Sequence, residues 1–294
     1  MDLSGLTKKQ SGVIFLIVYG LTLVFGLVIM FLGARYGKNF IITMLIADIL
    51  MTVVIFVVGL IIKNASLYDP YWSVIPFIII LFWAVAFQGF SLSLNSILLI
   101  IVVGIWSFRL TRNWWINWTG FAHQDWRYDM LKEKKPKLYP LTNLFGIHLI
   151  PTIVVFLQLL NGFDILHESG INIVFLIGVL ISLIAPFIQY IADKQMLEFR
   201  KNNIDKTKVI NTGLWRFSRH PNYFGELIFW IGIYIMYFSY SMSIDLNILY
   251  PISMILLFVF ISIPMMEKRL ASREGYQEYK KSVSMLIPFI QKKK

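Results

Sequence analysis

The sequence predicts an all-α fold, a polytopic membrane helical bundle of about seven or eight transmembrane helices with cytoplasmic N- and C-termini. The 294-residue chain is 57% hydrophobic and only 15% charged, whereas about a quarter of the residues of a soluble domain are charged. Its apolar residues form long blocks, each near the ~20 residues that cross a bilayer. A soluble core would have to hold several such blocks at once. One integral membrane domain over residues 1–294 is therefore the simplest interpretation.

Eight segments are apolar enough to be candidate spans. The third and fourth are joined by only three residues, which indicates a tight helical hairpin. The fourth is short, so we expect its helix to continue past Arg109 toward Trp118 at the membrane interface. In chain order the segments are Gly12–Gly33, Phe40–Ile62, Ser73–Phe90, Leu94–Phe108, Leu141–Leu160, Ile171–Ala192, Asn222–Tyr240 and Ile248–Met265.

The distribution of Lys and Arg predicts the orientation of these spans. The cations gather in residues 63–72, 109–140, 193–221 and 266–294, while the intervening loops 161–170 and 241–247 contain none. Cytoplasmic loops of membrane proteins carry an excess of Lys and Arg. We therefore expect a multi-pass protein of the cell (cytoplasmic) membrane, with residues 267–294 forming a cytoplasmic tail that begins as one charged helix.

Composition also excludes several kinds of site. The chain has no cysteine, and its four histidines form no metal-binding motif, so we predict no metal site. The net charge of +11 fits attraction to anionic lipid and cytoplasmic loops, and we expect no nucleic-acid partner. A transporter is disfavoured because no repeat symmetry is visible.

The most informative segment is GLWRFSRHPNYFGE at residues 213–226, which runs directly into an apolar stretch. It places Arg219, His220, Asn222, Tyr223 and Glu226 at a helix start, where Pro221 suits the first turn. Cations beside exposed backbone N–H groups suit an anion such as phosphate. A cytoplasmic anchor with interfacial aromatics is the alternative, but it does not explain Glu226 a turn inside the span. Ionisable groups there indicate a functional site.

Other polar clusters are weaker signals. Asp193 and Arg200 share one helix face with Gln189, although solvated charges at a helix end would look the same. Arg109 and Arg112 lie among tryptophans, as in an aromatic clamp or an interfacial belt.

Two further features stay open between alternatives. Asp69, in the segment YDPYWS, is either an acid at the mouth of a cavity or a turn former before proline. Tyr276 and Tyr279 share a helix face in the tail, as in a docking helix.

These motifs resemble the steroid 5-alpha reductase-like membrane family. GLWRFSRHPNYFGE, ADKQ…FR and EKR…Y…Y…LIPF resemble its C-terminal region over about residues 68–290, and WSFRLTRN…DWRY resembles its bacterial uncharacterised branch, domain of unknown function 1295. The resemblance implies NADPH bound near the cytoplasmic side and hydride transfer to the C=C bond of an enone on a steroid- or isoprenoid-like substrate.

The resemblance matches Asn222, Glu226, Asp193, Arg200 and Trp230 to family positions, and the polar clusters supply the other candidate residues. Glu226, Asp69 and Tyr223 are the catalytic candidates. Trp106, Trp230 and Trp72 are the candidates for the substrate pocket. The implied cofactor contacts are Asn222, Glu226, Asp193, Arg200, Gln189, Arg219, His220, Arg109, Arg112 and Tyr279.

The sequence departs from the family at the substrate. The family tyrosine that helps to hold the ketone aligns with Trp106, and its glutamate partner has no clear counterpart other than Asp69. The RHPNYxxE core also resembles membrane methyltransferases that use S-adenosylmethionine, which is the alternative function. In either case we expect a monomeric enzyme whose partners are the lipid bilayer and a hydrophobic small molecule.

Overall fold

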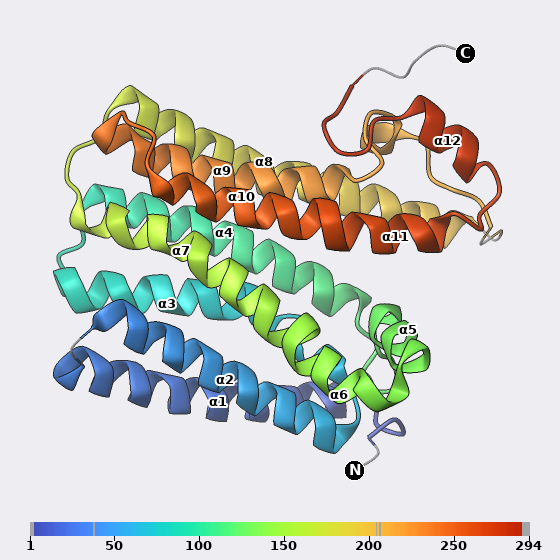
Figure 1. Cartoon of the computed structure of the whole chain (residues 1–294), viewed down its shortest axis with the longest axis horizontal. Coiled ribbons are helices and arrows are strands. Elements are labelled where there is room, and N and C mark those ends of the chain that lie inside the picture. The colour runs from blue at the N-terminus through green and yellow to red at the C-terminus, as the bar shows by residue number, and fades with distance from the viewer. Residues whose placement is uncertain (1–2, 38, 204, 206, 290–294) are drawn as a thin grey trace. The chain divides into compact units, whose positions relative to one another are not determined.

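The chain folds into helices, as the sequence predicts. The computed structural model describes residues 3–37, 39–203, 205 and 207–289, and within these it contains no β-strand (Figure 1). Seven helical segments in this described part are long and apolar enough to cross a membrane. They are Lys8–Tyr36, Phe40–Ile62, Ala65–Gln88, Leu94–Asn117, Pro136–His167, Ile173–Asn202 and Leu246–Leu270. The prediction of an all-α, multi-pass membrane protein is confirmed.

Most of the helices follow one another with short connections, and the longest connection, residues 203–220, joins α8 to α9. The α-helices are α1 (Lys8–Tyr36), α2 (Phe40–Ile62), α3 (Tyr71–Gln88), α4 (Leu94–Asn117), α5 (Trp126–Lys134), α6 (Tyr139–Thr142), α7 (Ile150–His167), α8 (Ile173–Asn202), α9 (Pro221–Ser241), α10 (Leu249–Leu257), α11 (Ile263–Leu270) and α12 (Tyr276–Ser282). Short 3-10 turns precede α3, α6, α9 and α10, and π-helical segments at Asn143–Leu149 and Phe258–Ser262 join α6 to α7 and α10 to α11.

Of the eight spans predicted from the sequence, the one at Asn222–Tyr240 is not among the seven candidate spans of the structure. It corresponds to helix α9. It is 21 residues long, but Asn222, Glu226 and its four tyrosines lower its hydropathy. Its core-facing residues are buried, including Glu226, Phe229 and Trp230. Polar groups in α9 are therefore turned into the protein, where other side chains can satisfy them.

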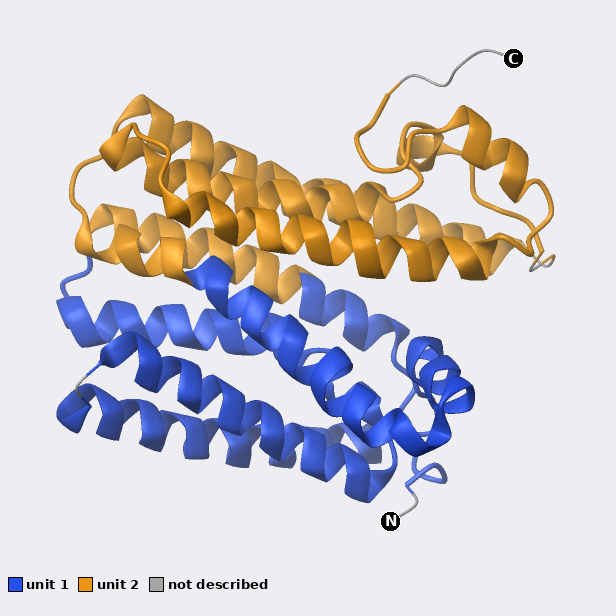
Figure 2. Cartoon of the chain, viewed as in Figure 1, with its two compact units in different colours: residues 1–92, 110–159 blue, residues 93–109, 160–294 orange. Residues whose placement is uncertain are grey.

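The chain forms two compact units (Figure 2). Unit 1 comprises residues 1–92 and 110–159, and unit 2 comprises residues 93–109 and 160–294. Helix α4 contributes its first part to unit 2 and its last two turns to unit 1.

Unit 1 is built on the pair α1 and α2. Thr7 caps α1 in a reciprocal capping box with Gln10, which fixes where the helix begins. Gly26 and Gly33 of α1 face Met51 and Thr43 of α2 so closely that an added Cβ would overlap those side chains. Small residues at such positions allow membrane helices to pack backbone against backbone.

Unit 2 is built on α8 and α9, which run side by side along their length. A Cβ on Gly178 of α8 would lie 2.6 Å from the backbone nitrogen of Met236, and one on Gly232 of α9 would lie 2.2 Å from the Ser182 hydroxyl. Gly225 similarly meets the Gln189 side chain. The glycines therefore let the two helices pack so closely that no larger side chain fits at these positions. This close packing brings polar residues of α8 and α9 within hydrogen-bonding distance of each other.

The ends of three helical segments can be compared with expectation. Helix α4 continues to Asn117, as expected, and α8 continues past the predicted span to Asn202, so that Asp193 and Arg200 lie in one helix, as their predicted shared face requires. The predicted single helix of the tail is wrong. It divides into α11 and α12 because Gly275 has φ = +71°, a left-handed conformation that interrupts the helix. The final residues of that tail, 290–294, fall outside the described part of the chain.

We predict that Gly232→Ala lowers the thermal stability of the protein. The added methyl group overlaps Ser182 and the Gly178 carbonyl, and overpacking of this kind typically costs about 1–3 kcal/mol. Thermal unfolding in detergent measures the change. The matched control is Gly20→Ala in α1, where the new methyl group meets no atom within 4 Å. Equal melting temperatures for the two variants would contradict the close packing of α8 and α9.

Candidate functional site

The candidate residues fall into separate groups, which follow the two units. Asp69, Trp72 and Arg112 belong to unit 1, and the remaining candidates belong to unit 2. Each group is built from its own helices.

The Glu226 carboxylate is the centre of the largest group in unit 2. Trp106 of α4 donates its indole N–H to both carboxylate oxygens, at 3.1 and 3.0 Å. Trp230 donates from one turn further along α9, at 2.9 Å, and the Gln189 amide donates from α8, at 2.7 Å. All four side chains are at most 3% exposed. A buried carboxylate is tolerated when several donors satisfy it, and here three do.

A second layer of polar residues lies one helix turn away. Arg109 donates to Asp193 at 2.7 Å, and Asn222 donates to the other oxygen of Asp193 at 3.3 Å. Each helix thus supplies residues to both layers, since Arg109 follows Trp106 by three positions, Asp193 follows Gln189 by four, and Asn222 precedes Glu226 by four. Residues three or four apart lie on one helix face. We call these six residues, together with Trp230, the two-layer cluster.

The two-layer cluster retains unused hydrogen-bonding capacity. Within the described residues, Nε of Arg109 and Oε1 of Gln189 are buried and have no hydrogen-bond partner. Buried polar atoms are nearly always paired, so one spare donor and one spare acceptor in the same cluster suit a bound group that has both. A carboxamide is such a group.

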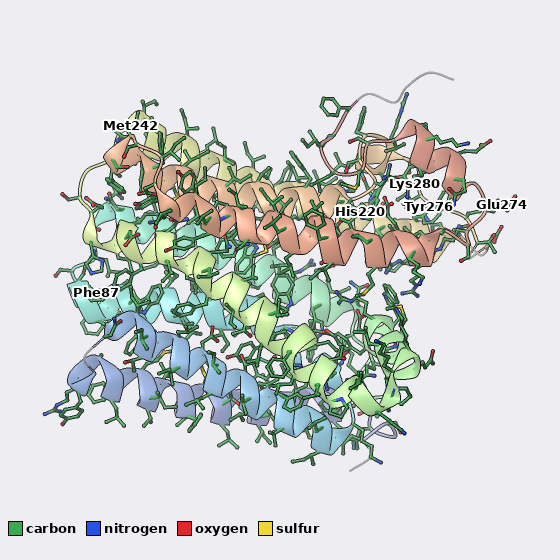
Figure 3. All side chains as sticks on the ribbon, viewed as in Figure 1. Phe87, His220, Met242, Glu274, Tyr276 and Lys280 are labelled. Carbon is green, nitrogen blue, oxygen red and sulfur yellow. The ribbon has the colours of Figure 1, made fainter. Side chains whose placement is uncertain are left out.

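Arg219 lies in a different arrangement. Its guanidinium is 2.6–2.8 Å from Glu267 of α11 and also donates to the backbone carbonyls of Lys280 and Val283. The Lys280 ammonium contacts the same carboxylate at 2.8 Å, and the His220 ring nitrogen lies 3.6 Å from it. Figure 3 labels His220 and Lys280 at this place. We call these residues the Glu267 hub.

The Glu267 hub and its neighbours hold the C-terminal segment in place. The Tyr279 hydroxyl donates to the Trp215 carbonyl at 2.6 Å, and the Ser218 hydroxyl donates to the Leu286 carbonyl at 2.7 Å. Burial lowers the pKa of His220, although the contact with Glu267 opposes that shift. Burial raises the pKa of Tyr279, because it disfavours the charged phenolate. In this structure Arg219, His220 and Tyr279, which we predicted as cofactor contacts, bind other parts of the chain.

The other predicted cations are exposed. Arg112 and Arg200 are solvent-accessible, as is Arg216 in the segment of residues 213–226. Tyr223 is partly buried, with its ring stacked on that of His220 at 5.2 Å. Asp193 and Arg200 share a helix face as predicted, but the hydrogen-bonded cation of Asp193 is Arg109.

Unit 1 brings Asp69 and Trp72 together. Both line a cavity of about 260 Å³ near the start of α3 and the end of α4. Asp69 accepts a hydrogen bond from the Tyr128 hydroxyl. A second, shallow cavity of about 380 Å³ in unit 2 is lined by Gln195, Glu198, Phe199, Asn202, Asn203 and Thr212, none of them a predicted site residue.

Sequence reasoning missed one polar pair in unit 1. Asp48, in the middle of α2, is 4% exposed and accepts a 2.8 Å hydrogen bond from the hydroxyl of Tyr71, which is 1% exposed. The ring of Tyr68 stacks on that of Tyr71 at 5.3 Å, and the Tyr68 hydroxyl is 2.8 Å from that of Thr152. The signal was present, because Asp48 is the one carboxylate in a 23-residue apolar helix.

Comparison with known proteins identifies the family. The model of the family described as protein of unknown function (DUF1295) matches residues 55–283. An uncharacterized protein of Schizosaccharomyces pombe, C594.04c, is 24% identical over 229 residues, which cover 68% of this chain and 65% of the yeast protein. The chain therefore spans less than two thirds of that relative. No solved structure matches it. The family match covers most of the chain, so the protein belongs to the DUF1295 family.

We predict that Glu226→Ala destabilises the protein strongly. It leaves the Trp106, Trp230 and Gln189 donors buried without an acceptor, and each unpaired buried donor costs about 1–3 kcal/mol. Thermal unfolding measures the loss, and near-UV circular dichroism detects the change in packing of Trp106 and Trp230 as a difference from the wild-type spectrum, to which all nine tryptophans of the chain contribute. The control is Glu198→Gln in α8, whose side chain is 57% exposed. Wild-type stability and spectrum in Glu226→Ala would show that this carboxylate does not organise the cluster.

Proposed function

We propose that this member of the DUF1295 family is a membrane-embedded reductase that adds hydrogen across the activated C=C bond of a hydrophobic enone, with NADPH as the hydride donor. The substrate class is steroid- or isoprenoid-like. The proposal combines the resemblance of residues 68–290 to the steroid 5-alpha reductase-like family with the chemistry of the buried polar groups.

The observation that carries the proposal is the hydrogen bond between Tyr71 and Asp48. Reduction of an enone places negative charge on the carbonyl oxygen, and a buried phenol can donate a hydrogen bond or a proton to that oxygen. In this structure Asp48 accepts the one phenolic hydrogen, so Tyr71 can donate to a substrate oxygen only with Asp48 in its protonated form, which then donates to the Tyr71 oxygen and frees that hydrogen. The family resemblance implies a tyrosine and a carboxylate at the substrate ketone, and this pair has that composition without Trp106 or Asp69.

The two-layer cluster suits the nicotinamide half of the cofactor. A carboxamide needs a donor for its oxygen and an acceptor for its nitrogen, and Arg109 Nε and Gln189 Oε1 are the unused atoms of those kinds. Asn222 and Asp193 can contact ribose hydroxyls. NADPH, when bound, supplies the hydride. The cluster holds two carboxylates and one guanidinium, so phosphates are better matched to the exposed Arg200 and Arg216.

A second candidate is a methyltransferase that uses S-adenosylmethionine. One observation favours it, namely that Arg109 and Arg219 are each paired with a carboxylate of the chain. A methyl donor without phosphates needs no such cations. The buried Tyr71–Asp48 pair favours the reductase, because methyl transfer does not develop charge on a carbonyl oxygen.

We predict that NADPH and NADP raise the melting temperature of the detergent-solubilised protein, whereas S-adenosylmethionine and S-adenosylhomocysteine do not. A ligand at 100 times its Kd stabilises the folded state by about 2.7 kcal/mol. The variant Asn222→Ala should lose most of this shift, and Asn202→Ala, an exposed residue at the end of α8, should keep it. If S-adenosylmethionine alone stabilised the protein, the reductase proposal would be wrong and the methyltransferase would be the better assignment.

We also predict that Tyr71→Phe lowers kcat for enone reduction by about 10²–10⁴-fold, the usual contribution of a positioned acid, and keeps the NADPH-induced shift. Oxidation of NADPH with a 4-en-3-one steroid and an isoprenoid enal as probes measures the rate. The matched control is Tyr19→Phe, which also removes a buried hydroxyl, one that donates to the Leu67 carbonyl. Equal rates in the two variants would remove Tyr71 from the reaction.

A further inference from the structure

The cavity of unit 1 has a lining that differs from both groups discussed above. Its volume, about 260 Å³, equals that of roughly nine liquid waters. Its lining is aromatic and polar, with Leu110 as the single aliphatic side chain among the described residues that line it. A cavity built for a hydrocarbon would have more aliphatic and fewer charged side chains in its lining.

Three tryptophans from two helices supply the aromatic part of the lining. Trp72 comes from the first turn of α3, Trp114 comes from the last turn of α4, and Trp118 follows α4 directly. The rings of Trp114 and Trp118 stack with centroids 4.9 Å apart. The face of an indole ring carries negative potential and attracts cations, and aromatic groups of this kind are how proteins bind organic ammonium groups.

The charges of the lining add up to a net negative site. Arg127 makes two hydrogen bonds to the Asp125 carboxylate, at 2.8 and 3.0 Å, so these two side chains largely neutralise each other. Asp69 supplies a second carboxylate, which the Tyr128 hydroxyl holds. His123 is the remaining titratable group in the lining. In a chain with a net charge of +11, this cavity is an exception that suits a cation.

The cavity lies where membrane-spanning segments end. Asp69 and Trp72 are at the start of the span Ala65–Gln88, and Asn113, Trp114 and Asn117 are at the end of the span Leu94–Asn117. Tryptophans at such positions usually lie at the level of the lipid headgroups. A ligand in the cavity would therefore be within reach of both water and headgroups.

We propose that this cavity binds a small organic ammonium group, with the tryptophans that line it as the aromatic contacts and Asp69 as its counter-ion. The ammonium group belongs either to a phospholipid headgroup or to a free amine of similar size. The site is independent of the proposed reductase chemistry, since it uses neither the two-layer cluster nor the Tyr71–Asp48 pair.

The test is titration of the intact protein in detergent with choline, ethanolamine and 3,3-dimethyl-1-butanol, the uncharged carbon isostere of choline. Tryptophan fluorescence and thermal unfolding report binding. We expect saturable binding of at least one amine and none of the isostere. Asp69→Asn should weaken binding at least tenfold, whereas Asp129→Asn, which changes an exposed carboxylate of α5 outside the lining, should not change it.

Nanodiscs distinguish the two sources of the ammonium group. If the ligand is a headgroup, the wild-type protein is more stable in phosphatidylcholine or phosphatidylethanolamine discs than in phosphatidylglycerol discs, and Asp69→Asn removes the difference. If it is a free amine, the soluble probes bind equally well in all discs. Two results would overturn the proposal: equal binding of choline and its isostere, or neither an amine signal nor a lipid preference that depends on Asp69.

Discussion

The close approach of α8 and α9 is the constraint on which unit 2 depends. Three glycines let the two backbones meet, and the Gln189 side chain then reaches Glu226 at 2.7 Å. Lipid offers no hydrophobic drive for helices to associate, so tight packing and polar contacts must supply the attraction. In unit 2 both act at the same place, because the glycine contacts position the donors and the carboxylate holds them.

Much of this fold is readable in the sequence. Span length, cation placement and the polar start of α9 predict a multi-pass helical protein and point to Asn222 and Glu226. Gln189 and Asp193 follow from helix periodicity. Periodicity cannot predict the contribution of α4, because nothing in the spacing of Trp106 and Arg109 indicates that they contact Glu226 and Asp193.

The predicted role of the basic residues illustrates the limit of reasoning from charge alone. Arg219 looked like a phosphate ligand because it stands near a helix start, yet it contacts Glu267 and two backbone carbonyls. The partner is 48 residues away in sequence, and no local pattern reveals it. Asp48 was overlooked because it belongs to no motif, although a single carboxylate in an apolar helix is itself a signal of a functional site.

The spacing of the two-layer cluster also sets the register of α8 against α9. These helices run in opposite directions, so Gln189 faces Glu226 while Asp193 faces Asn222. A slide of one turn in one direction would bring Asp193 opposite Glu226 and force two carboxylates together away from water. A slide the other way would put Ala185 there and remove a donor. Buried polar residues can fix the alignment of apolar helices in this way. Apolar contacts alone would allow α8 and α9 to slide along each other, whereas the polar pairs favour one alignment.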